Sequence, residues 1–108
     1  MAHYLVQASY TTEAIAALVH KPQDRTAVVR KAVESLGGKL VGSWMSFGDQ
    51  DVVLIIDMPD NVSAAAMVLA ASAGGSLKST KTTPLFTFEE ATAAGKKAAT
   101  SGYTPVQK

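Results

Sequence analysis

The chain has 108 residues, 47% of them hydrophobic and 18% charged, which is enough apolar material for the core of one domain. Ten Lys and Arg residues against nine Asp and Glu give a formal net charge of +1, which argues against a broad nucleic-acid or anionic-membrane surface. Because the sequence has no cysteine, it excludes disulfides, thiolate metal centres and cysteine nucleophiles.

The first residues lead directly into a strand pattern, with no basic segment followed by an apolar one, so we expect no secretory signal. The longest apolar run, residues 64–71, is far shorter than the roughly 20 residues that a membrane helix needs. These features predict a soluble, cytoplasmic protein that binds neither nucleic acid nor membranes.

The first part of the chain predicts one strand and two helices. Residues 3–10 are rich in Tyr, Leu and Val, which favours a strand. Thr11 can cap a helix over residues 12–20, and a second helical period runs over residues 26–36. The charged residues of this second period fall outside its apolar stripe, on what we expect to be a solvated face. These residues are Arg25, Arg30, Lys31 and Glu34.

The second part predicts a hairpin followed by a helix, a strand and a final helix. Residues 39–47 and 51–58 are strands joined by a turn so short that they must pair antiparallel. A helix over residues 61–73, which Asp60 or Asn61 can cap, precedes a Thr-rich strand over residues 76–86. Pro84 indicates that the end of this strand lies at an edge or outside the ladder. A capping box at Thr87 and Glu90 then begins a short helix that ends near residue 99.

The order of strands and helices is β-α-β-β-α-β with an added C-terminal helix. This order predicts an α+β protein of the ferredoxin-like type, a four-stranded antiparallel sheet with helices on one face. We expect residues 1–100 to form this single domain and residues 101–108 to be a flexible tail.

Two strands carry apolar side chains on both faces. In residues 51–58, we expect Val52, Leu54 and Ile56 on one face and Val53 and Ile55 on the other. In residues 39–47, the same period puts Leu40 and Trp44 on one face and Val41, Met45 and Phe47 on the other. Because helices can cover only one face, we expect a second copy of the chain to cover the other, as in a dimeric α+β barrel. The alternative is that the C-terminal segment folds back over that face.

Several sequence blocks in one order resemble the GYD domain family of small bacterial and archaeal proteins. The blocks are residues 4–11, 34–40, 47–53, 57–61 and 82–85, and the resemblance covers about residues 4–90. Gln50 stands where the family usually has a tyrosine before Asp51, so any ligand contact of that tyrosine is missing here. The resemblance implies a ferredoxin-like dimeric barrel and no established reaction.

Three residues are candidates for binding a small molecule. Gln7 and Ser9 share one face of the first strand and interrupt an apolar stretch, and Trp44, the single tryptophan, offers a flat apolar wall. Trp44 equally fits a core position. The sequence does not decide whether Gln7 and Trp44 face the same side, nor whether the pocket lies between sheet and helices or at the barrel interface.

The remaining polar residues favour structural roles. His3 and His20 fall on different elements, no spacing suggests a metal site, and we expect no cofactor. Asp51 and Asp57 lie roughly 20 Å apart along a strand, so they cannot work as paired acid and base, and Asp51 fits a turn or strand end. Lys78 and Lys81 protect an edge strand or form the anion-binding rim of a barrel.

These observations predict a self-associating protein that binds a small molecule. Two alternatives remain open. One is a cofactor-independent enzyme of the monooxygenase or isomerase type, for which His3 is the available acid or base. The other is a purely structural assembly module, which needs no enclosed cavity.

Overall fold

The computed structural model describes residues 1–107 and contains four strands and four helices. The strands are β1 (Ala2–Tyr10), β2 (Lys39–Met45), β3 (Val52–Met58) and β4 (Leu77–Leu85). The helices are α1 (Thr12–His20), α2 (Thr26–Ser35), α3 (Asn61–Ala73) and α4 (Phe88–Ala98). All eight predicted elements are present in the predicted order.

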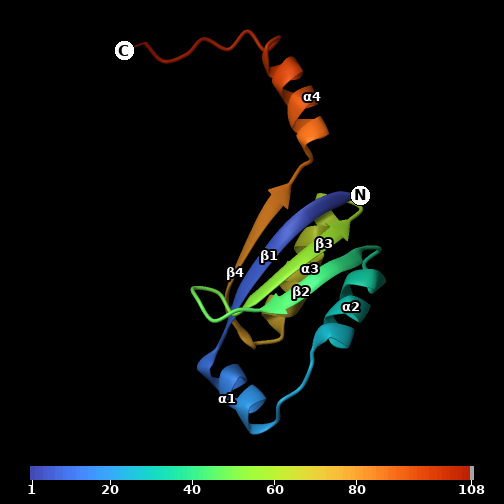
Figure 1. The fold of residues 1–108 in the computed structure, drawn as a ribbon, viewed down its shortest axis with the longest axis vertical. Helices are drawn as coiled ribbons and strands as arrows, with labels where there is room; N and C mark the ends of the chain where they lie inside the picture. The colour runs from blue at the N-terminus through green and yellow to red at the C-terminus, as the bar shows by residue number, and fades with distance from the viewer. Residues whose placement is uncertain (108) are drawn as a thin grey trace.

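The strands form one antiparallel sheet in the order β2-β3-β1-β4. Figure 1 shows α3 behind this sheet and no helix in front of it. This arrangement confirms the predicted α+β, ferredoxin-like class. It also confirms that the strand containing Pro84 lies at an edge, where a missing N–H costs little.

The core lies between the sheet and the helices α2 and α3. The register places Tyr4, Val6 and Ala8 of β1 beside Ile56, Leu54 and Val52 of β3. From the helices, Val33 of α2 and Met67 of α3 pack against this strand pair. Val33, Ile56 and Met58 are fully buried, and burying a side chain of this kind stabilises the fold by about 1.5–3 kcal/mol.

Side-chain caps begin three of the helices at the predicted residues. The Thr11 hydroxyl accepts a hydrogen bond from the amide of Ala14, and the Asp60 carboxylate accepts one from the amide of Ser63. The capping box of Thr87 and Glu90 is complete at the start of α4. Each cap satisfies a backbone N–H that the helix itself leaves free.

Two helices stand apart from the core. α1 lies beyond one end of the sheet and α4 leads away from the other end, and neither contains a buried residue (Figure 1). Phe88, the first residue of α4, is 95% exposed. The radius of gyration is 17.4 Å, whereas a compact domain of this length has about 13 Å. A single chain therefore leaves apolar parts of both terminal regions without a packing partner.

A bulge in β2 corrects the predicted faces of that strand. The register shifts between Leu40 and Gly42, so Val41 is an extra residue and the two-residue period changes side there. Leu40 pairs with Ile56 on the helix-covered face, whereas Trp44 pairs with Val53 on the other. The prediction that Leu40 and Trp44 share a face was wrong, because it assumed an unbroken strand that also included Phe47.

Candidate functional site

The face of the sheet that no helix covers, here called the open face, is the first candidate. Cross-strand register assigns its residues, beginning from the odd-numbered positions of β1. They are His3, Leu5, Gln7, Trp44, Val53, Ile55, Asp57, Lys81, Thr83 and Leu85. Leu5 and Ile55 make the centre of this face apolar, and apart from Thr83 its polar side chains lie in two rows across the strands.

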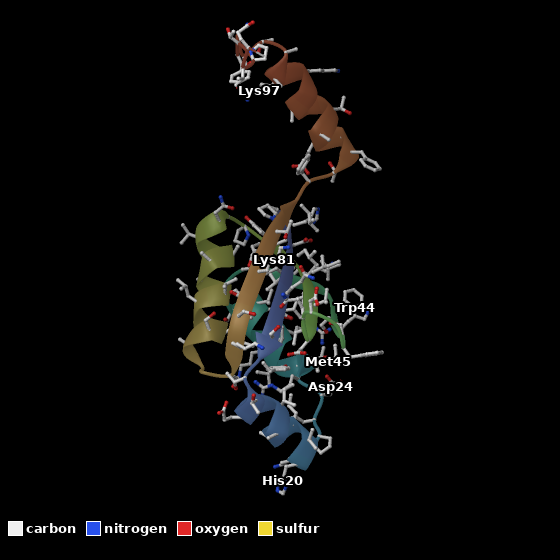
Figure 2. All side chains as sticks on the ribbon, turned by 90° about the vertical axis from the view of Figure 1, so that its left-hand side faces the viewer. His20, Asp24, Trp44, Met45, Lys81 and Lys97 are labelled. Atoms are coloured by element: carbon white, nitrogen blue, oxygen red, sulfur yellow. The ribbon has the colours of Figure 1, made fainter. Side chains whose placement is uncertain are left out.

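One row brings together two of the three predicted ligand-binding residues. Gln7 pairs with Val53 on β3, and Val53 pairs in turn with Trp44 on β2, so Gln7 and Trp44 face the same side. Lys81 of β4 continues the row beyond Gln7. The Trp44 side chain is 56% exposed, and Figure 2 shows it pointing away from the side of the sheet that carries α3.

The indole of Trp44 lies against the backbone at Gly42. A Cβ atom at Gly42 would be 2.5 Å from Cη2 of Trp44, closer than real Cβ contacts occur. The glycine therefore leaves the space that the ring fills. Together, the bulge and this glycine place a broad aromatic surface on the open face.

Ser9, the third predicted residue, is held by the loop between β2 and β3. It is buried, and its hydroxyl lies 3.0 Å from Oε1 of Gln50 and 3.3 Å from the carbonyl oxygen of Asp49. Ser9 therefore anchors the loop to β1, and the structure does not bring it together with Trp44. Gln50, the residue that departs from the family pattern, supplies the acceptor.

Asp51 occupies the strand-end position that the sequence favoured for it. Its carboxylate accepts a hydrogen bond of 2.9 Å from the amide of Tyr10, and its own amide donates to the carbonyl of Ala8 at 2.9 Å. Both contacts join β1 to the residue before β3. The hydrogen bonds of Asp51 therefore hold backbone groups of β1, which is a structural role.

A histidine–aspartate pair lies on the second polar row. His3 and Asp57 are cross-strand partners, and Nδ1 of His3 donates to the Asp57 carboxylate. Lys39 pairs with Asp57 from the other side. Sequence reasoning missed this pair because it depends on the register of two strands that are 54 residues apart in the chain. No spacing in the sequence signals it.

The helix-covered side contains the second candidate, a hollow with two adjoining lobes, the larger of which extends to Trp44 at the β2 edge of the sheet. The lobes have volumes of about 430 and 330 Å³, and both are lined by Tyr10, Arg25, Val29, Val52 and Leu54. We call the larger one the outer lobe and the smaller one the inner lobe. These volumes are in the range of pockets that hold small molecules, roughly 300–1,000 Å³.

Small side chains leave the inner lobe open. Its floor includes Val6 and Ala8 of β1, and Ala70, Ala71 and Gly74 form part of its wall on the α3 side. None of these three is large enough to reach across to α2. A partly enclosed space of this size and lining is therefore a candidate ligand site.

Among residues 1–107, Arg25 is the single charged residue that lines the inner lobe, and it also lines the outer lobe. The sequence placed it on a solvated helix face. Arg25 precedes α2 as its N-cap residue and is exposed to solvent, as the sequence predicts. It therefore belongs to the mouth of the hollow.

The fold and the two candidate sites define an α+β protein with an uncovered apolar sheet face and a sheet–helix hollow. The chain matches the GYD domain over residues 4–94, which is most of its length. The protein therefore belongs to the GYD domain family. No curated protein sequence is significantly similar to it.

Solved structures that are similar to the chain include MtbAldR and an uncharacterized NIPSNAP domain protein. The crystal structure of MtbAldR matches with a TM-score of 0.52 and 10% sequence identity, over 80% of this chain and 52% of that one. The chain thus spans about half the length of that protein. An uncharacterized NIPSNAP domain protein from Burkholderia xenovorans matches with a TM-score of 0.47 and 15% identity, over 81% of this chain and 94% of that one. The likeness to MtbAldR supports the fold alone.

Among residues 1–107, no helix is long and apolar enough to cross a membrane. Within the same residues, no three His, Asp or Glu side chains come together as a metal site would require.

Proposed function

We propose that the protein works as a self-assembled small-molecule binder. Two copies bury the open faces of their sheets against each other, and each copy holds a ligand in its own sheet–helix hollow. The observation that carries the proposal is the difference between the two faces of the sheet. One face is apolar and uncovered, and the other is helix-covered but contains an apolar space.

The chemistry of the open face suits a second copy of the chain. The face combines Leu5, Val53 and Ile55 with the exposed Trp44, and monomers rarely leave apolar patches of this kind in water. The net charge of +1 adds almost no repulsion between copies. The unpacked α4 also gains a possible packing partner, since isolated helices of its length are only marginally stable.

A charge in the centre of the open face tests the assembly. In sedimentation velocity, we expect the natural protein to sediment as a dimer or larger particle. Ile55→Lys should sediment as a single chain, because two lysines would be buried without partners in each interface. Leu69→Lys is the matched control, since Leu69 is 69% exposed on α3 and lies outside the open face. Equal assembly of both variants would contradict the proposal.

In this proposal Gln7 and Trp44 belong to the contact between copies. Their amide and indole N–H groups lie in the same row as Lys81, and they would need partners once the sheets meet. A ligand held between the sheets would supply such partners. Ligand contact by Gln7, Ser9 and Trp44 stays a prediction.

Filling the inner lobe tests the hollow. Octanoate and 1-octanol serve as probes, and binding is followed by ¹H–¹⁵N shifts of the amides of Val29, Val52 and Gly74. We expect at least one probe to shift these amides, and Ala71→Leu to abolish the shifts because leucine occupies the lobe. Ala65→Leu on the exposed side of α3 should leave binding unchanged. If neither probe shifts the amides, the hollow does not bind small molecules of this size.

A second candidate function is acid–base catalysis, which the His3–Asp57 pair favours. When Nδ1–H donates to Asp57, Nε2 is left as a base, and the carboxylate holds the ring in place. In this case turnover of a substrate would fall in His3→Ala and partly in Asp57→Asn, and it would be unchanged in His20→Ala. Unchanged turnover in His3→Ala would remove the assignment.

A further inference from the structure

We propose that the ligand of the hollow is an apolar molecule with a single carboxylate, and that Arg25 binds the carboxylate. The chemistry is that of a medium-chain fatty acid. This inference rests on the proposed small-molecule site and names the class of its ligand.

The walls of the hollow require an apolar body. Val52 and Leu54 of β3 line both lobes on the sheet side, and Val29 lines both lobes on the α2 side. On the other side of the inner lobe, Met67 and Ala71 of α3 add further apolar surface. Besides Arg25, only Tyr10, Ser76 and Thr80 among residues 1–107 bring polar side chains to the inner lobe. A ligand that is polar along its length would therefore lose more hydration there than these groups replace.

Arg25 supplies the recognition of an anion. Among residues 1–107, no carboxylate lies within 4.0 Å of its guanidinium. A guanidinium presents two parallel N–H groups that match a carboxylate, which makes it a specific as well as a strong partner. Tyr10, which lines both lobes beside Arg25, carries a hydroxyl that can donate to the same group.

The acidic neighbour of Arg25 does not compete for it. Asp24 lines the outer lobe, but its carboxylate accepts a hydrogen bond of 2.8 Å from the amide of Thr26. The hydrogen bonds from Thr26 hold the pKa of Asp24 below its usual value, and Arg30 lowers it further. Asp24 is thus part of the first turn of α2. In the part of the chain that the structure describes, no Asp or Glu lines the inner lobe, so its charge favours an anion.

The inner lobe sets the size of the ligand. At roughly 30 Å³ for each non-hydrogen atom, the volume of a water molecule in the liquid, 330 Å³ accommodates about eleven such atoms. Octanoate is close to this size, and its carboxylate would reach the mouth at Arg25 when its chain lies on Val52 and Leu54.

The decisive experiment compares octanoate with 1-octanol, which has a chain of the same length and no charge. Dissociation constants come from the amide shifts of Val29, Val52 and Gly74. We expect octanoate to bind more tightly than 1-octanol, and Arg25→Gln to weaken octanoate by at least about tenfold, the loss expected for a charge-assisted hydrogen bond. In the same variant, the affinity for 1-octanol should not change.

Lys31→Gln is the matched control, because it also removes one positive charge, from an exposed position within α2 that does not line either lobe. It should bind octanoate as the natural protein does. Equal affinities for both probes, or equal losses of octanoate affinity in both variants, would overturn the proposal that Arg25 binds a carboxylate. Either result would leave the small-molecule site in place. If neither probe binds, the site and its ligand class both fail.

Discussion

Asp51 shows how one side chain secures the end of the sheet near the loop. Its carboxylate accepts a hydrogen bond from the Tyr10 amide, and its own amide donates one to the carbonyl of Ala8. Asp51 therefore joins β1 to the start of β3. Ser46 adds a backbone hydrogen bond to the carbonyl of Asp51. The loop that carries the family motif therefore has a structural role, because its last residue is hydrogen-bonded to β1.

Removing this carboxylate should destabilise the fold. Asp51→Ala leaves the Tyr10 amide without its acceptor, and we expect a loss of about 1–3 kcal/mol in the free energy of unfolding. Urea denaturation measures it. Asp49→Ala is the control, because Asp49 is exposed and contributes only its backbone carbonyl to Ser9. Equal free energies of unfolding for the two variants would show that the Asp51 carboxylate does not stabilise the fold.

The cap of α3 makes stability depend on pH. The backbone hydrogen bond from Ser63 is the main cause that holds the pKa of Asp60 below its usual value. A lowered pKa means that folding favours the ionised form, so the contribution is complete above the pKa of a free aspartate, about 3.9, and is lost as the pH falls below it.

Asp60→Asn tests this dependence, because asparagine caps a helix without titrating. We expect the natural protein to lose its advantage over the variant as the pH falls through the acidic range, measured as thermal midpoints at several pH values. A constant difference between the two proteins would indicate that Asp60 does not stabilise the fold through its charge.

The elements of the fold are local features, and the sequence predicted them well. The caps at Thr11, Asp60 and Thr87 and the short turn between β2 and β3 each depend on neighbouring residues. The bulge at Val41 was not predictable in this way, because it is a mismatch between two strands. It reverses the facing of Trp44, which is why the predicted grouping with Leu40 failed.

The space at Gly42 gives a test of this geometry. Gly42→Ala would bring a Cβ atom to 2.5 Å from the Trp44 ring, so the indole must move off the sheet. Since Trp44 is the single tryptophan, we expect its fluorescence emission to shift to longer wavelength. Gly48→Ala is the control, because no atom lies within 4 Å of a Cβ there. An unchanged spectrum in Gly42→Ala would contradict the stacking of the indole on Gly42.

At the scale of the whole molecule, the hollow and the His3–Asp57 pair depend on tertiary contacts that local sequence patterns do not predict. The hollow exists because residues from β1, α2, β3 and α3 meet around it, and Arg25 enters it from a position that local patterning assigns to solvent. The His3–Asp57 pair likewise needs the sheet to form. The two-sided apolar pattern of β3, by contrast, was visible from the start.

That pattern leads to the central claim, which is that the open face is covered by another copy of the chain. The elongated shape, the exposed Trp44 and the unpacked α4 all describe a chain that has not buried the surface available to it.

Native mass spectrometry of the purified protein tests the claim most directly, because it counts the chains in each particle. We expect particles of two chains or a multiple of two. A spectrum of single chains alone, at concentrations where the protein is folded, would contradict the claim and leave the open face without its partner.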